Sequence, residues 1–119
     1  MPYGTTHADF AYGAVPCTRD LTAKEIETDY ELNTGRVIAE CFKERKLDYS
    51  AVPAVLVHSH GPFTWGKDCF DAVHNSVILE EVAKMAFFSE ALGASTASEY
   101  IQKKHYFRKH GKNAYYGQG

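Results

Sequence analysis

Val55-Leu-Val-His-Ser-His-Gly-Pro-Phe-Thr-Trp-Gly66 joins an apolar, β-branched run to two histidines and a Gly-Pro pair. The apolar run predicts a buried strand over residues 54–58, and the Gly-Pro pair predicts a turn that ends it. Residues 63–65 are then a hairpin partner or a short continuation. Alternation along a regular strand places His58 and His60 on one face, whereas a bend at Gly61 separates their roles.

The two histidines are candidates for metal binding or acid–base chemistry, because neutral imidazole does both near pH 7. The plain alternative is a pair of hydrogen-bonded structural histidines at a strand end. A His-x-His pair supplies at most two ligands, and a catalytic zinc usually needs three protein ligands. No second compact cluster of ligands is visible among the other histidines of the sequence, which are His7, His74, His105 and His110.

The first half of the chain contains one predicted helix. Thr22-Ala-Lys-Glu25 has the pattern of a capping box, and apolar residues at helical spacing continue from it to about Lys46. Gly35 weakens the middle of this helix without ending it. Residues 1–20 are rich in Gly, Thr and aromatic residues, and they look like a loop or short edge strands.

Two further helices are predicted after the hairpin. Asp68 is a suitable N-cap for a helix with an apolar stripe, and Gly93 is its plausible end. Thr96-Ala-Ser-Glu99 is a second capping box, and it opens a helix that Gly111 closes. The pattern by itself therefore indicates an α+β fold.

Composition narrows the class of protein. The chain has 119 residues, 45% of them hydrophobic, and a formal charge of −2, so it fits one small domain or part of a larger one without a basic field for nucleic acid. The three cysteines Cys17, Cys41 and Cys69 are odd in number and widely spaced, which indicates reduced thiols and a cytoplasmic location. We find neither a signal peptide nor an apolar stretch that could span a membrane.

The predicted secondary structure contains few strands. A two-stranded ribbon is marginal by itself, and the aromatic residues near both ends of the chain need other surfaces to cover them. The chain begins Met1-Pro-Tyr-Gly4, with no cap or strand leading in. We therefore expect residues 1–119 to be a portion of a larger domain.

Several long motifs agree with one known family. They are Gly4-Thr-Thr-His-Ala-Asp9, the hairpin stretch up to Lys67, Lys104-His-Tyr-Phe-Arg-Lys-His-Gly111 and Ala114-Tyr-Tyr-Gly-Gln118. In these motifs the chain strongly resembles the L-ribulose-5-phosphate 4-epimerases of the class II aldolase/epimerase superfamily. The resemblance covers essentially the whole chain, in order, and corresponds to the C-terminal half of the family enzyme.

The resemblance implies a fold and a metal. The family fold is an α/β, three-layer αβα sandwich with a mainly antiparallel central sheet, of which this chain would be the C-terminal part. The family holds a divalent metal, usually Zn²⁺, with three histidines, and only the one that precedes Gly, His60, falls in this chain. The other two belong to a His-Thr-His motif of the family that lies upstream of the matched region, and the family's phosphate-binding glycine and serines also lie upstream. His58 inherits no ligand role, and it either supports the site or is a buried structural histidine.

The resemblance also implies the acid–base residues. Asp9 matches the catalytic aspartate of the family, and Tyr116 matches the second tyrosine of its C-terminal Tyr-Tyr-Gly. Both would reach the metal site across a subunit boundary. From the residues alone, Asp9 could equally be a turn aspartate and Tyr116 a packing aromatic. Thr5 and His105 are lesser candidates for shaping the substrate pocket, and Glu31 is either near that region or a solvated helix residue.

The implied reaction interconverts L-ribulose 5-phosphate and D-xylulose 5-phosphate in arabinose- or ascorbate-type sugar metabolism. The inverted carbon bears no acidic proton, so the family cleaves and remakes a carbon–carbon bond by retro-aldol and aldol steps, with zinc polarising the ketone. The implied enzyme is a homotetramer with a sugar-phosphate substrate, and this chain alone would be inactive. Two alternatives remain open, a sugar-phosphate aldolase of the same superfamily and a non-catalytic fragment that assembles with related subunits.

Overall fold

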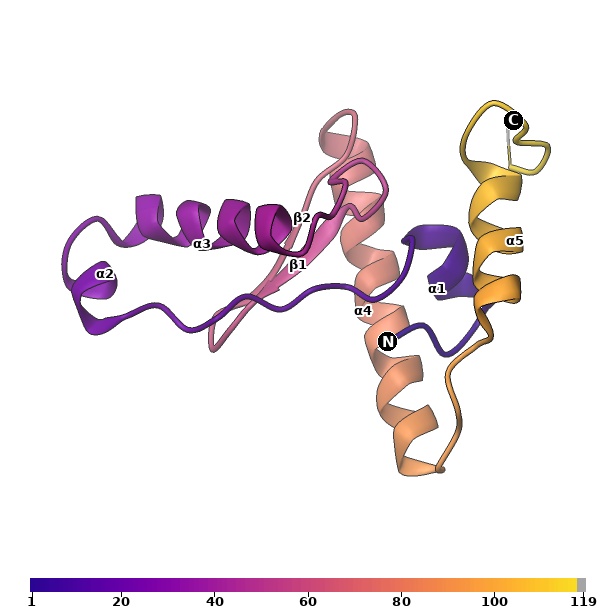
Figure 1. Ribbon diagram of the computed structural model, residues 1–119, viewed down its shortest axis with the longest axis horizontal. Coiled ribbons are helices and arrows are strands. Elements are labelled where there is room, and N and C mark those ends of the chain that lie inside the picture. Colours follow the sequence, from indigo (N-terminus) through magenta and orange to yellow (C-terminus); the bar gives the residue numbers. More distant parts are fainter. Residues whose placement is uncertain (118–119) are drawn as a thin grey trace.

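The computed structural model describes residues 1–117, which form five helices and one two-stranded sheet (Figure 1). The molecule is elongated, with extents of 47 × 35 × 25 Å. Gln118, the last residue of the C-terminal motif, lies outside the described residues. The elements in chain order are α1 (Thr5–Phe10), α2 (Ala23–Glu27), α3 (Tyr30–Glu44), β1 (Ala54–Val57), β2 (Gly61–Thr64), α4 (Cys69–Ala91) and α5 (Glu99–Lys109).

The predicted hairpin is present, but the predicted turn at Gly61-Pro62 is wrong, because these two residues begin β2 and pair with β1. Strands β1 and β2 pair antiparallel, with Ala54 opposite Thr64 and Val57 opposite Gly61. Strand β1 is the buried strand expected from its apolar residues, although it ends at Val57, one residue before the predicted end. Residues 58–60 form the connecting turn, in which the His60 N–H donates to the Val57 carbonyl.

The helix starts are only partly those of the prediction. The Thr22 capping box opens α2, and the Asp68 carboxylate accepts from the Asp71 N–H at the start of α4. Gly93, with φ of 73°, follows the end of α4 as expected. The second capping box is wrong, because Ser98 and not Thr96 caps α5.

The long first helix is also divided. A break separates α2 from α3 at residues 28–29, where the Asn33 amide donates to the Glu25 carbonyl and the Thr28 hydroxyl donates to the Lys24 carbonyl. These side chains bond to carbonyls near the break, so the helix can end there without leaving them unpaired.

Residues 1–20 differ from the expectation of loop and edge strands. Thr5–Phe10 forms α1, which packs along α5. Within the described part of residues 1–20, the expected strand pairing is limited to one parallel bridge, between Cys17 and Leu56. Main-chain hydrogen bonds flank this bridge on both sides. Tertiary contact with α5 explains a helix in a segment whose composition favours loops.

The core lies where α1, the C-terminal part of α3, strand β1 and the middle of α4 meet. Its buried residues include Phe10, Phe42, Val55 and Leu79, all below 10% exposed. This cluster fixes the end of α1, and so places the residues of α1 that face α5. The fold is a mixture of helices and strands with a small antiparallel sheet. Within residues 1–117, no helix has both the length and the apolar character needed to cross a membrane.

Candidate active site

Asp9 lies at the contact between α1 and the last turns of α5. Arg108 approaches its carboxylate with two nitrogens, Nη2 at 3.0 Å from Oδ2 and Nε at 3.3 Å from Oδ1. Nδ1 of His105 lies 3.1 Å from Oδ1, and Nζ of Lys109 lies 3.5 Å from Oδ2. The Asp9 side chain is only 15% exposed. A sequence motif near the N-terminus and another near the C-terminus therefore meet in one charged cluster.

The cluster sets the protonation state of Asp9. Burial raises the pKa of the Asp9 carboxyl, but hydrogen bonds from Arg108 and His105 and the charge of Lys109 outweigh it, so the pKa is lowered overall. Asp9 is therefore an ionised carboxylate at neutral pH. Because a carboxylate can only accept, the His105 Nδ1 that faces it carries the proton.

Tyr116 belongs to the same cluster through Arg108. The centre of the Arg108 guanidinium lies 4.0 Å from the Tyr116 ring centroid, and the Tyr116 N–H donates to the Arg108 carbonyl at 2.9 Å. Tyr116 is half exposed. The structure thus brings together three of the residues singled out from sequence, Asp9, His105 and Tyr116.

Arg108 is the residue that the sequence reasoning missed. Its signal was present, because His105 and Arg108 are three residues apart on a helix and therefore share a face. His110, also missed, donates from Nε2 to the Asp9 main-chain carbonyl at 2.9 Å. Basic residues on a helix are usually solvated, whereas here Arg108 and Lys109 face a carboxylate.

The histidine two residues before Asp9 in the N-terminal motif has a different role. His7 is 5% exposed, and its Nε2 lies 2.8 Å from the Gly13 carbonyl. Burial lowers the pKa of His7, so the neutral imidazole is favoured. His7 therefore binds the segment that follows α1, through the Gly13 carbonyl. Asp9, on the same short helix, faces α5.

His60 lies elsewhere, in the turn between β1 and β2. Its ring stacks on Phe63 at a centroid distance of 5.2 Å and lies 6.4 Å from the ring of Tyr30. In Figure 1 this turn projects toward the side of α2 and α3, well away from α5. A single copy of the chain therefore does not bring His60 to Asp9 and Tyr116.

The idea that His58 and His60 share a strand face is wrong. The strand ends at Val57, and Ser59 has a φ of 59°, so the backbone reverses before Gly61. His58 instead contacts Asp20, with Nδ1 2.5 Å from Oδ1, and lies 3.0 Å from the Ser59 hydroxyl. Its side chain is 50% exposed, so it is not buried in this chain, and its supporting role stays a prediction.

Thr5 and Glu31, the remaining candidates, are both exposed. Thr5 is the first residue of α1, one turn before Asp9. Glu31 is in the first turn of α3, next to the Tyr30 ring that faces His60. Neither side chain has a hydrogen bond to another residue within positions 1–117. Their predicted roles stay predictions.

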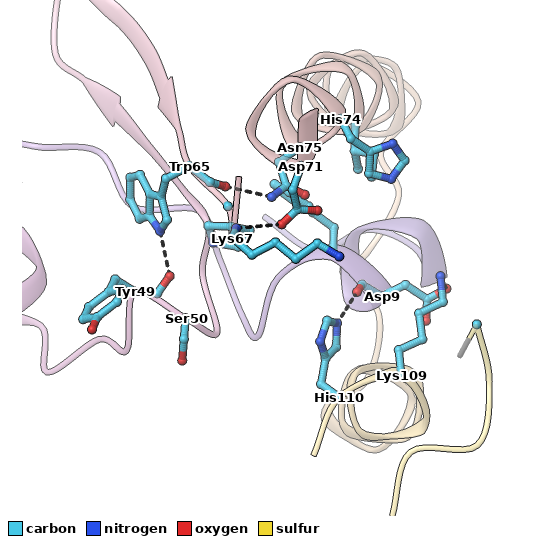
Figure 2. Close-up of a pocket in the computed structure, with 15 residues that line it drawn as sticks. Asp9, Tyr49, Ser50, Trp65, Lys67, Asp71, His74, Asn75, Lys109 and His110 are labelled. Carbon is cyan, nitrogen blue, oxygen red and sulfur yellow. Dashed lines mark hydrogen bonds and ion pairs between the residues drawn. The ribbon is translucent and has the colours of Figure 1, made fainter. Parts of the chain in front are cut away.

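A pocket of about 710 Å³ adjoins the Asp9 cluster. Figure 2 shows that the segment after β2 and the start of α4 line one side of it, Asp9 and the end of α5 line another, and Tyr49 and Ser50 before β1 complete the lining. The first of these sides is fixed by hydrogen bonds from the Lys67 N–H to the Asp71 carboxylate and from the Asn75 amide to the Trp65 carbonyl. The pocket is large enough for a small polar metabolite.

The residues of this chain do not by themselves fit a metal ion. Within residues 1–117, no three His, Cys, Asp or Glu side chains are grouped so that they could hold one. His60 contributes one imidazole, and a single imidazole cannot fix a tetrahedral site. Any metal centre therefore needs ligands from outside the described chain.

Comparison with known proteins defines the class. Residues 1–87 match the class II aldolase and adducin N-terminal domain, and the chain belongs to this family. Members of the class II aldolase family generally depend on a divalent metal.

The chain is also similar to individual curated proteins. The chain is 50% identical to the L-ribulose-5-phosphate 4-epimerase UlaF of Salmonella paratyphi A and to that of Salmonella typhi, in each case over 117 residues that make up 97% of this chain. The enzyme of the same name from Salmonella paratyphi C is similar to the same extent. The matched region is 50% of the length of each relative, so the chain spans about half of these proteins.

Proposed function

We propose that this chain supplies the acid–base half of an L-ribulose-5-phosphate 4-epimerase, which interconverts L-ribulose 5-phosphate and D-xylulose 5-phosphate. The observation that carries the proposal is the contact of one guanidinium, that of Arg108, with both Asp9 and Tyr116. The two residues whose types suit proton transfer are thereby adjacent, although they are near opposite ends of the chain. The likeness to enzymes of that name over nearly the whole chain supports the same function.

The chemistry assigns these residues to proton transfer. Inversion at a carbon without an acidic proton requires that its bond to the neighbouring carbon be broken and remade. One group must take the proton of the C4 hydroxyl as the bond breaks, and another must return a proton when the aldehyde has turned its other face. Asp9 is ionised at neutral pH, so it enters as an acceptor, and Tyr116 enters as a donor.

A complete centre requires more than one copy of the described residues. His60 and the Asp9 cluster lie on separate parts of the molecule, so His60 of one subunit would face Asp9 and Tyr116 of a neighbour. We propose the homotetramer and the three-layer αβα sandwich of the family as the arrangement that achieves this. Residues 1–119 would be the C-terminal portion of that domain, and a divalent metal, when bound with further ligands, would stabilise charge on the substrate ketone oxygen.

The test compares Asp9→Asn, Tyr116→Phe and Tyr115→Phe in the protein of the relatives' length that carries this sequence. Asp9→Asn and Tyr116→Phe should each lower turnover by about a hundredfold or more while metal content is kept. Tyr115→Phe is the matched control, because the ring of this adjacent tyrosine packs with Lys104, and it should be near wild type. Both epimers are quantified by NMR.

Other outcomes would support the alternatives. Net release of glycolaldehyde phosphate without epimerisation would identify a sugar-phosphate aldolase. Near-normal epimerisation by both Asp9→Asn and Tyr116→Phe would remove these residues from the mechanism. No turnover by a folded, metal-loaded protein would support the non-catalytic, assembling role.

A further inference from the structure

Arg108 lies between the two residues proposed to transfer protons. Its Nη2 and Nε nitrogens are 3.0 and 3.3 Å from the two oxygens of Asp9. The face of the same guanidinium lies 4.0 Å from the ring centroid of Tyr116. The main-chain carbonyl of Arg108 also accepts from the N–H groups of Tyr115 and Tyr116, at 2.7 and 2.9 Å.

These contacts need an arginine. A guanidinium donates from its edge to a carboxylate and at the same time packs its flat face on an aromatic ring, which an ammonium group cannot do in one geometry. The Arg108 side chain is 21% exposed, so the pair with Asp9 is partly shielded from water. Tyr116 follows the end of α5 in an irregular segment, where the side chain and the carbonyl of Arg108 both hold it.

We propose that Arg108 is a positioning residue that holds the Asp9 carboxylate and the Tyr116 ring as one unit, so that the two residues lose their function together when it is removed. This inference rests on the proposed function. His105, Lys109 and His110 also face Asp9 from α5, and Lys67 and His74 line the pocket beside it. Lys109 also lies near both Asp9 and the Tyr116 ring, but its nitrogen is farther from each than the Arg108 guanidinium, at 3.5 and 5.7 Å.

The kinetic test uses Arg108→Ala and Arg108→Lys in the protein of the relatives' length that carries this chain. Both should lower kcat by about tenfold or more with little change in KM, because positioning acts on the reacting geometry and not on substrate affinity. Added guanidinium ion should restore part of the activity of Arg108→Ala but none to Arg108→Lys. Lys104→Ala is the matched control, since Lys104 lies over the Tyr115 ring on the same helix without touching Asp9.

Coupling is read from combined variants. Adding Arg108→Ala to Asp9→Asn should cost much less than Arg108→Ala costs in the wild type, because the unit is already broken. Additive losses, or a raised KM with unchanged kcat, would overturn the positioning role and assign Arg108 to substrate binding or to neither.

A titration independent of activity separates this inference from the proposed function. The Asp9 carboxyl carbon is followed by NMR as pH is changed. Loss of Arg108 should raise the pKa of Asp9, and the acidic limb of the kcat profile should move to higher pH with it. If the wild-type protein does not epimerise at all, the proposed function fails while this titration still decides whether Arg108 holds Asp9. An unchanged Asp9 titration in both variants would overturn the inference.

Discussion

At the scale of single residues, the site is a carboxylate surrounded by cations from one helix. Sequence motifs were sufficient to select Asp9, His105 and Tyr116, and the structure places them together. They were not sufficient to find Arg108, because a basic residue on a helix is usually solvated and only the fold shows that α1 covers this face. The separation of His60 from the Asp9 cluster could not be predicted from the sequence either, because it depends on the direction in which the hairpin turn projects.

The lowered pKa of Asp9 predicts that the folded protein loses stability in acid. The folded carboxyl has a pKa below its ordinary value of 3.8, so it contributes stability above that value, and this contribution is lost as pH falls through the folded pKa. Asp9→Asn removes this contribution. We therefore expect the difference in unfolding free energy between wild type and Asp9→Asn to shrink below about pH 4, measured by urea denaturation at several pH values.

His7 provides an internal check on that measurement. Its pKa is lowered by burial, so the folded state resists protonation and loses stability as pH falls below about 6.5. This loss starts at higher pH and should be the same in wild type and in Asp9→Asn. A difference between the two proteins that stays constant down to pH 2 would show that Asp9 is not held by its cations.

At the scale of elements, the hairpin and the helix starts were predictable where one local signal dominates. The apolar run gave β1, and Asp68 gave the start of α4. Prediction failed where several local signals compete or where tertiary contact decides. The break between α2 and α3 arises from side chains such as Asn33 that bond to main-chain carbonyls, and α1 forms against α5 in a segment of poor helical composition.

Helix α4 exposes large apolar side chains to solvent. Phe70, Val73 and Val77 are 83%, 65% and 60% exposed, while Leu79 and Val82 on the same helix are buried. A helix with apolar residues on nearly every side is usually enclosed on every side. We therefore expect the 119-residue chain by itself to associate, aggregate or remain partly molten.

Two substitutions on α4 separate core packing from association. In the protein of the relatives' length, Leu79→Ala should lower the free energy of unfolding by about 2–5 kcal/mol, because it leaves a cavity in the core. In the 119-residue chain, Val77→Lys should increase the monomeric fraction in sedimentation velocity, because it charges an exposed apolar face. Wild-type chain that sediments as a monodisperse monomer and unfolds cooperatively would contradict the expected association.

At the scale of the whole molecule, the chain is more open than a domain of its length. Its radius of gyration is 15.4 Å, against about 13.5 Å for a compact domain of this size. Its accessible surface is 8114 Å², against about 6,500 Å² expected from its mass. The excess is about twice the area that one partner contributes to a standard interface. This agrees with a chain that spans half the length of its relatives.

The ligand-type residues of the described chain also predict its response to metal. Of the three histidine ligands that the resemblance implies, only His60 would fall in this chain, and residues 1–117 contain no group of three His, Cys, Asp or Glu side chains that could hold a metal ion. We expect calorimetric titration of the 119-residue chain to show weak zinc binding or none, because one protein ligand does not compensate for the water ligands that the metal loses. In the protein of the relatives' length, His60→Ala should lose metal and activity together, whereas His58→Ala, the matched control two residues away, should keep the metal. Tight one-to-one zinc binding by the short chain, or full metal occupancy in His60→Ala, would remove His60 from the metal site and require another explanation for the separation between the hairpin and the Asp9 cluster.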